Sequence, residues 1–283
     1  MHKIKDMKKI FYLLGISTLL MACGSTQEEQ EAAKEADSLA TVENEGDLLA
    51  STTMDPRTFG GAKHQDQLFI DDMFPASDNT PDQILGCYVG EFGKNMINIT
   101  LYKIEDGRAE GYSVCAGNFR KIEGTVDLMQ DDEYIFEMDE PGDDQYDGHF
   151  SFTLDASEQM VKGSWTPFKE KGNSSKNYKL EKREFHYNPN VGSWPEVSTT
   201  ELDDEFFMNY NSDELATMRN EIYARHGYSF KNKDWRYYFE GKDWYMPMGI
   251  DIRDKLTEVE VANIEKIYEY ESYMEDYYDE YGR

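Results

Sequence analysis

Between about residues 83 and 190, hydrophobic and polar residues alternate with period two, which is typical of strands with one buried face. In the stretch 149–154, three apolar side chains alternate with three polar ones. Turn residues such as Asp106-Gly107 and Pro141-Gly142 interrupt the pattern about every ten positions. The pattern predicts eight strands, near residues 84–92, 95–103, 108–116, 119–128, 133–138, 147–154, 159–167 and 176–185.

Short gaps between these segments predict an antiparallel meander, either closed as a barrel or left as a curved sheet. Closure would remove the exposed edge strands. Glycines that precede bulky residues, such as Gly86, Gly111, Gly124 and Gly163, suit tight bends in a small barrel. The arrangement resembles the lipocalin and avidin folds in layout only, so it carries ligand binding over only as an analogy.

After about residue 200 the period becomes helical. Leu215, Met218 and Ile222 predict a helix that begins behind Ser212-Asp213 and ends at Gly227. A second helix is predicted to begin at Thr257, which forms a capping box with Glu260. Its apolar face continues into a tyrosine-rich acidic end through Tyr270, Tyr273, Tyr277 and Tyr281. The expected fold class is therefore α+β and multidomain, with an antiparallel β-barrel-like domain followed by a small α-rich domain.

The helical part also carries a recognisable motif. Residues 220–230 read Asn-Glu-Ile-Tyr-Ala-Arg-His-Gly-Tyr-Ser-Phe, and Tyr238-Phe239, Trp244-Tyr245 and the 256–260 segment follow at matching positions. This region, about residues 203–272, resembles the YARHG domain, which is named for its pentapeptide. The resemblance implies an extracellular domain of the kind attached to bacterial lipoproteins, peptidases and kinases. It implies no catalytic residues.

The N-terminus predicts secretion and lipidation. Four lysines within the first nine residues precede an apolar stretch that is too short to span a bilayer and suits a signal peptide. The stretch ends in Leu-Met-Ala-Cys, and Cys23 resembles the lipobox cysteine of bacterial lipoproteins. That resemblance implies cleavage before Cys23 and attachment of several acyl chains such as palmitate, which together anchor stably. Gly24 favours the outer membrane, on its periplasmic or surface-exposed side.

Four parts follow from these patterns: a signal peptide (1–22), a lipidated acidic and mostly disordered tether (23–82), the β domain (83–190) and the YARHG domain (200–283). The chain has 57 acidic and 29 basic residues and a formal charge of −28. Such a surface repels nucleic acids and anionic lipid headgroups. We therefore expect no nucleic acid among its partners, and contact with the membrane through the lipid anchor.

Two groups of residues are candidates for binding. Arg225 and His226, with Arg219 and Glu221, would suit an anionic or sugar ligand. They equally suit a structural role, because His226 lies at a helix end and Glu221 can pair with Arg225 one turn away. The second group is the aromatic run from Trp235 to Tyr245, in which Trp244 and Tyr245 are expected near the surface. For both groups the structural interpretation is favoured.

The sequence predicts no metal site, cofactor or catalytic residue, because the five histidines are scattered and no nucleophile motif is present. Cys87 and Cys115 form a candidate disulfide worth about 3–4 kcal/mol in an oxidising envelope. The first and third strands of a meander lie about 9.5 Å apart, which opposes this bridge. Spacing alone leaves the question open.

Three functions are compatible with these observations. The leading hypothesis is a non-enzymatic binding module of the envelope, whose partner is a protein or a cell-wall glycan. The second is a carrier that holds a small apolar ligand inside the barrel. The third is a hydrolase without a readable motif. A barrel filled by its own side chains would count against the carrier.

Overall fold

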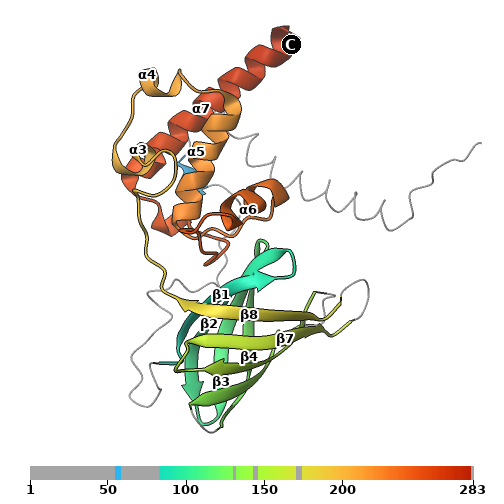
Figure 1. Cartoon of the computed structure of the whole chain (residues 1–283). Helices are drawn as coiled ribbons and strands as arrows, with labels where there is room; N and C mark the ends of the chain where they lie inside the picture. The colour runs from blue at the N-terminus through green and yellow to red at the C-terminus, as the bar shows by residue number, and fades with distance from the viewer. Residues whose placement is uncertain (1–54, 59–82, 130–131, 143–145, 170–173, 282–283) are drawn as a thin grey trace, which may run out of the picture. The chain divides into compact units, whose positions relative to one another are not determined.

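The computed structural model describes residues 55–58, 83–129, 132–142, 146–169 and 174–281, and all of them belong to one compact unit, residues 48–283. A β-barrel comes first along the chain and helices follow it (Figure 1). The predicted signal peptide, Cys23 and nearly all of the tether lie outside the described residues. From the tether, the short 3₁₀ helix η1 (Pro56–Thr58) is described, and Arg57 pairs with Glu258 at 2.7 Å.

The barrel consists of eight antiparallel strands in simple sequence order. The strands are β1 (Gly86–Phe92), β2 (Asn95–Glu105), β3 (Arg108–Cys115), β4 (Asn118–Leu128), β5 (Glu133–Asp139), β6 (Gly148–Asp155), β7 (Met160–Pro167) and β8 (Lys176–Arg183). Each strand pairs with the next, and β8 pairs with β1, so the barrel is closed. The eight predicted strands are confirmed, and the choice between a barrel and an open sheet is settled in favour of the barrel.

Local sequence explains the hairpins. Asp106 and Gly107 have φ of 51° and 74°, which two-residue hairpin loops require, and this turn was predicted. Ala116 and Gly117 form a second such turn, with φ of 51° and 71°. Gly163 lies opposite Phe152, where an added Cβ would stand 2.8 Å from the Phe152 Cα atom. The glycine therefore allows the two strands to approach around a bulky ring.

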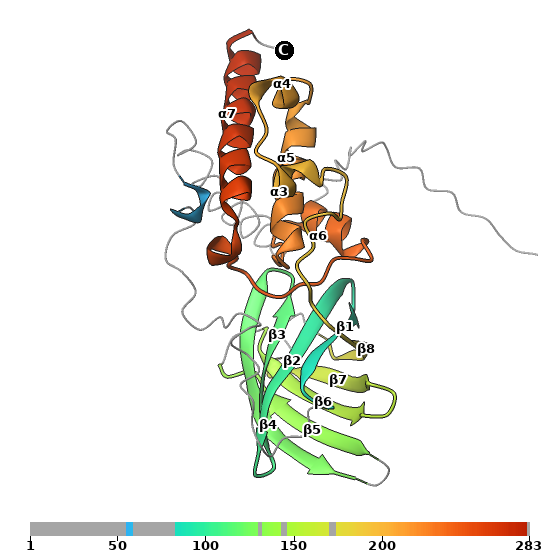
Figure 2. The same ribbon diagram turned by 90° about the vertical axis from the view of Figure 1, so that its left-hand side faces the viewer.

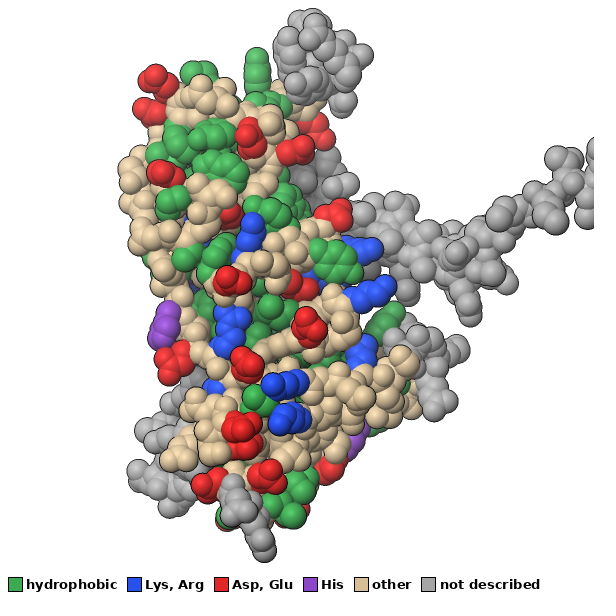
Figure 3. Space-filling view, in the orientation of Figure 1, with side chains coloured by type: hydrophobic (Ala, Val, Ile, Leu, Met, Phe, Trp, Pro, Cys, Tyr) green, Lys and Arg blue, Asp and Glu red, His purple; other side chains and the backbone are tan. Residues whose placement is uncertain are grey.

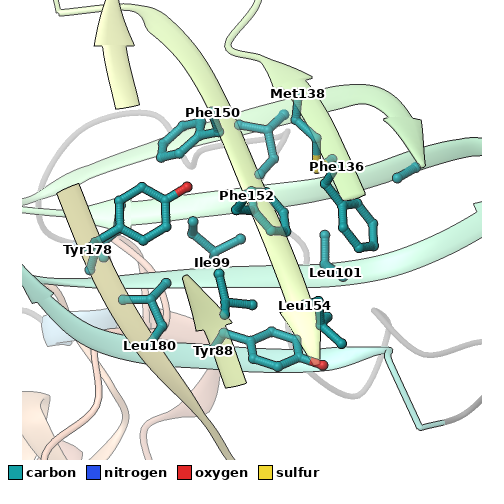
Figure 4. Packing of buried hydrophobic residues seen from close by; sticks show 14 of the residues in the cluster. Tyr88, Ile99, Leu101, Phe136, Met138, Phe150, Phe152, Leu154, Tyr178 and Leu180 are labelled. Carbon is teal, nitrogen blue, oxygen red and sulfur yellow. The ribbon is translucent and has the colours of Figure 1, made fainter. Parts of the chain in front are cut away.

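Large side chains fill the barrel interior (Figure 4). Phe136 and Phe152 stack with ring centroids 4.8 Å apart, and both are buried. Ile99 and Leu101 from β2 have no exposed surface. A cavity large enough for a ligand would leave accessible surface on the side chains that line it. These residues have almost no accessible surface, so the centre of the barrel is a packed core.

The C-terminal part is helical. Its helices are α3 (Glu196–Thr199), α4 (Asp204–Phe207), α5 (Ser212–Arg225), α6 (Lys233–Glu240), the 3₁₀ helix η2 (Arg253–Lys255) and α7 (Glu258–Tyr281). Helices α5 and α7 run side by side (Figure 2). Their contact buries Leu215, Met218, Ile222, Ile264 and Ile267 completely. The two predicted helices are therefore present, and they form the core of this domain.

The helix ends correct two details of the sequence interpretation. The cap of α5 is Asn211, which forms a capping box with Glu214, so the Ser212-Asp213 pair lies inside the helix. The predicted capping box of α7 is present, because the amide of Glu260 donates to Thr257 Oγ1. Tyr273, expected on the apolar face of α7, is 67% exposed. Tyr273 therefore lies off the apolar face, to which Tyr270 and Met274 belong.

The outer faces of β1 and β2 are covered by the helical domain. Cys87 and Val89 pack with Met246 and Met248. Asn98 is fully buried although its side chain points away from the barrel interior, and its Nδ2 donates to the carbonyl of Pro247 at 2.9 Å. Buried polar groups need such partners. The barrel and the helices therefore share an apolar and hydrogen-bonded contact.

Candidate binding surface

Arg225 is at the centre of a buried hydrogen-bond network. Its Nε donates to the carbonyl of Val191, Nη1 to Ser198 Oγ and Nη2 to the carbonyl of Trp194, each at 2.9 Å. Nη2 also lies 3.1 Å from Glu221 Oε2, and neither side chain is more than 1% exposed. Burial lowers the pKa of Arg225, and the Glu221 carboxylate opposes that shift. The guanidinium is thus engaged with the protein itself.

Glu221 extends this network to the segment that precedes the helices. Its carboxylate accepts hydrogen bonds from the amides of Ser193 and Trp194. The predicted pair of Glu221 and Arg225 is present, but it lies in the interior instead of on the surface. Together the two side chains fasten residues 191–198 to α5. The helical domain consequently begins before residue 200, where the sequence placed its start.

His226 caps the end of α5 and faces the start of α7. Its Nε2 lies 2.7 Å from Glu260 Oε2, and its ring stacks on Tyr187 with centroids 4.4 Å apart. The other carboxylate oxygen of Glu260 accepts from Ser198 Oγ at 2.7 Å. Burial acts to raise the pKa of Glu260, but the bonds from His226 and other donors outweigh it and leave that pKa below its ordinary value. Gly227 follows with φ of 77°, as expected for a left-handed helix cap.

Arg219 does not belong to this network. Its Nε lies 3.1 Å from Glu271, and its guanidinium stands 4.7 Å from the centroid of the Tyr268 ring. Burial would lower the pKa of Arg219, but Tyr268 and Glu271 raise it. The four polar residues singled out around the pentapeptide are thus divided between two separate arrangements.

The aromatic run from Trp235 to Tyr245 is divided between core and surface. Tyr245 is 1% exposed, and its hydroxyl donates to the carbonyl of Tyr228 at 2.8 Å. Its ring lies 6.0 Å from that of Phe239, which is fully buried. The expectation that Tyr245 lies near the surface is therefore wrong, because this small domain uses the ring to fill its core. Trp244 is half-buried against Phe239.

Helix α6 presents the other side of this run to solvent. Tyr237 is 41% exposed and Tyr238 is 37% exposed. Lys233 Nζ and the Arg236 guanidinium each lie 5.6 Å from the centroid of the Tyr237 ring. Lys242 Nζ lies 4.1 Å from the centroid of the Tyr238 ring. We call these five residues the α6 surface, and Figure 3 shows Lys and Arg side chains beside hydrophobic ones over this helix.

The cations of the α6 surface form no close ion pair with described carboxylates, although the charge of Arg236 acts on Glu240 and its Nη1 donates to the carbonyl of Lys231. Lys233, Arg236 and Lys242 form no ion pair within the part of the chain that the structure describes, and neither does the adjacent Lys231. Three carboxylates occur in the same stretch, those of Asp234, Glu240 and Asp243. Glu240 is half-buried, and desolvation raises its pKa. Sequence reasoning named the aromatic run but did not separate these exposed rings from the buried ones.

The two described cysteines are free thiols. Cys87 lies on the outer side of β1 in the contact with Met246 and Met248, whereas Cys115 packs against the interior core of the barrel. Side chains on opposite sides of a barrel wall cannot meet, so the candidate disulfide is not formed. Burial raises the pKa of both thiols, which makes them poor nucleophiles.

Comparison with known proteins identifies the helical part. The YARHG domain matches residues 192–272, and the closed eight-stranded barrel precedes it. The match begins near the segment that Arg225 and Glu221 fasten to α5, and it includes the α6 surface. A search of curated proteins found no match to this chain.

Two further findings bear on the kind of site. Over the described residues, no helix combines the length and the apolar character that crossing a bilayer demands. Within the same residues, no group of three or more histidine, cysteine or acidic side chains is placed to hold a metal ion.

Proposed function

We propose that this chain is a lipid-anchored protein of the bacterial outer membrane that acts as a non-enzymatic binding module. Its partner is an envelope protein or a cell-wall glycan, and the α6 surface of the YARHG domain contacts that partner. The observation that carries the proposal is the combination of two exposed tyrosine rings on α6 with cations that form no ion pair among the described residues. Of these cations, Lys233 and Arg236 lie on the helix and Lys242 lies just after it. Tyrosine and arginine are enriched at binding surfaces, and Tyr237, Tyr238 and Arg236 are of these types.

The alternative binding residues of the domain support this choice by their burial. Arg225 and His226 form their hydrogen bonds with residues 191–198, α5 and α7. A ligand could reach them only by displacing those partners, and breaking a buried ion pair costs about 3–5 kcal/mol. The pentapeptide therefore builds the domain, and a neighbouring helix offers the accessible chemistry.

The anchor rests on the sequence of the first 23 residues. A basic start, a short apolar stretch and Cys23 together favour lipidation. An anchored chain needs little affinity for a partner in the same envelope, because tethering raises the effective concentration. A shallow surface on a small domain is then sufficient.

The packed barrel counts against the carrier hypothesis. Phe136, Phe152, Ile99 and Leu101 occupy the centre that an apolar ligand would need. The free cysteines do not favour the hydrolase, because their raised pKa values suppress the thiolate. The barrel is better explained as the support on which the helical domain is held through Asn98 and its neighbours.

Photo-crosslinking in living cells tests the proposal on the full, anchored chain. A photoreactive phenylalanine is placed at position 237 or 238, and at position 273 as a control, because Tyr273 is also exposed. We expect an adduct from 237 and 238 that Lys233→Ala with Lys242→Ala removes, and no such adduct from 273. The same adduct from all three positions, or none from 237 and 238, would contradict the proposed surface.

A further inference from the structure

We infer that the partner of the α6 surface is an anionic polysaccharide whose sugars carry carboxylate groups. This inference rests on the proposed function, and it goes further by selecting one partner class over an envelope protein. It follows from how the rings and the cations of the α6 surface are arranged, and from the charge of the rest of the chain.

The rings supply exposed aromatic surface for a sugar, and the cation that lies over each ring face would have to move aside onto an acidic group of that sugar. Tyr237 and Tyr238 are adjacent on α6 and keep 41% and 37% of their surface exposed. The face of an aromatic ring is electronegative and attracts the polarised C–H groups of a sugar. The ring of Tyr238 is held in place by the buried Phe239, because the two rings lie edge to face with centroids 4.9 Å apart. A ring held in this way loses little conformational entropy when a ligand stacks on it.

The cations lie where the acidic groups of such a polymer would be. Lys242 Nζ stands 4.1 Å from the Tyr238 centroid, and Lys233 and Arg236 stand 5.6 Å from the Tyr237 centroid. When a carboxylated sugar contacts either ring, the ammonium or guanidinium that lies over that ring can turn to pair with the carboxylate. Charge-assisted hydrogen bonds of this kind are stronger than neutral ones. Ring and cation thus recognise one sugar unit together.

The charge balance of the stretch differs from that of the chain. Residues 231–243 contain four basic and three acidic residues, whereas the whole chain has a formal charge of −28. The acidic Glu240 turns towards the barrel, where it accepts a hydrogen bond from the backbone of Met96. A polyanion is repelled by most of this protein and accepted here, so the charge pattern also selects where it binds.

The composition of the α6 surface favours a glycan over a protein partner. Protein–protein interfaces have an apolar, well-packed centre from which lysine is depleted. Here Lys233 and Lys242 lie directly against the rings, and no exposed aliphatic side chain belongs to α6. The lysines would have to be desolvated under a protein, whereas a carboxylated sugar chain would pair with them and leave them hydrated.

Calorimetric titration of the full-length protein in detergent tests this assignment with three probes of similar length. These are a hexamer of galacturonic acid, maltohexaose as its neutral counterpart, and hexaglutamate as an acidic peptide. We expect the galacturonate hexamer to bind at least about tenfold more tightly than either of the others, since loss of either the charge or the sugar ring removes a principal contact.

Matched variants locate the binding. Lys233→Ala with Lys242→Ala, and separately Tyr237→Ala with Tyr238→Ala, should each weaken galacturonate binding at least about tenfold. As a control, Lys162→Ala with Lys179→Ala removes two exposed lysines at paired positions of β7 and β8. This variant should bind the galacturonate hexamer with unchanged affinity. An unchanged melting temperature in each variant shows that the fold is retained.

The outcomes separate this inference from the proposed function. Equal binding of hexaglutamate and galacturonate would overturn the glycan assignment, because charge alone would then suffice. Binding of none of the probes would overturn it as well. In both cases the crosslinks from positions 237 and 238 would still decide whether the α6 surface contacts another partner.

Discussion

The Nε2 atom of His226 lies 2.7 Å from Oε2 of Glu260, and this contact joins the end of α5 to the first turn of α7. The same carboxylate caps α7 by accepting from the amide of Thr257, and it accepts from Ser198 in α3. One buried side chain therefore fixes three segments that are far apart in the sequence. As the partner of Glu260, the pentapeptide residue His226 has a structural role in this domain.

Glu260→Gln is expected to destabilise the protein in a pH-dependent way. Burial acts to raise the pKa of Glu260, but the bond from His226 and the other donors hold it below its ordinary value. A depressed folded-state pKa gives stability that is present above the unfolded pKa and is lost as pH falls through the folded value. We expect a loss of about 1–3 kcal/mol near pH 5 that shrinks towards pH 3. Urea unfolding at both pH values measures it, and a constant difference would refute the role of ionised Glu260.

Gly117→Ala should destabilise the protein more than Gly107→Ala. Both glycines have positive φ, of 71° and 74°, so both alanines carry the left-handed backbone cost of about 1–2 kcal/mol. At position 117 the new Cβ would also stand 2.7 Å from the backbone nitrogen of Lys231, whereas at 107 its nearest neighbour is 3.7 Å away. Melting temperatures compare the two variants. Equal shifts would show that the β3–β4 turn does not contact the helical domain in solution.

The wild-type barrel should take up no apolar ligand. Phe152→Ala would remove a ring from the packed centre and cost about 3–5 kcal/mol, and the space created would admit a small apolar molecule. Fluorescence of an added apolar dye reports uptake, with Leu128→Ala as the control because Leu128 is 64% exposed. Stoichiometric uptake by the wild-type protein would restore the carrier hypothesis.

Replacing Cys23 should release the protein from the membrane. Cys23→Ser removes the sulfur that lipidation requires, and the low affinity proposed for the α6 surface does not by itself hold the chain to membranes. We expect incorporation of labelled palmitate to disappear and the protein to move from the membrane fraction to the soluble one. Continued sedimentation of the variant with membranes would contradict an anchor at Cys23.

The barrel could be predicted because its determinants are local. Alternation with period two and turns such as Asp106-Gly107 fix each strand and its register with the next. Closure between β1 and β8 could not be predicted, because it depends on how strongly the sheet curves. Helix α6 was missed because its eight residues make only about two turns, which is too short a stretch to establish a helical period.

The binding surface could be predicted only in part. The pair of Glu221 and Arg225 follows from helical spacing, but the carbonyls of Val191 and Trp194 that bury it lie about thirty residues upstream. No local pattern reveals such partners. Tyr238 and Tyr245 belong to the same aromatic run, and nothing in the sequence around them distinguishes a buried ring from an exposed one. The fold places Tyr245 in the core and leaves Tyr238 exposed.

Hydrogen exchange of α6 inside the native envelope tests the central claim most directly. Amide exchange of residues 231–243 is measured in isolated envelopes and again after purification in detergent, with strands β5 and β6 as the internal reference. We predict slower exchange of this stretch in the envelope than in the purified protein, and no difference for the reference strands. Equal exchange of residues 231–243 in both states, or protection confined to the barrel, would contradict binding through the α6 surface.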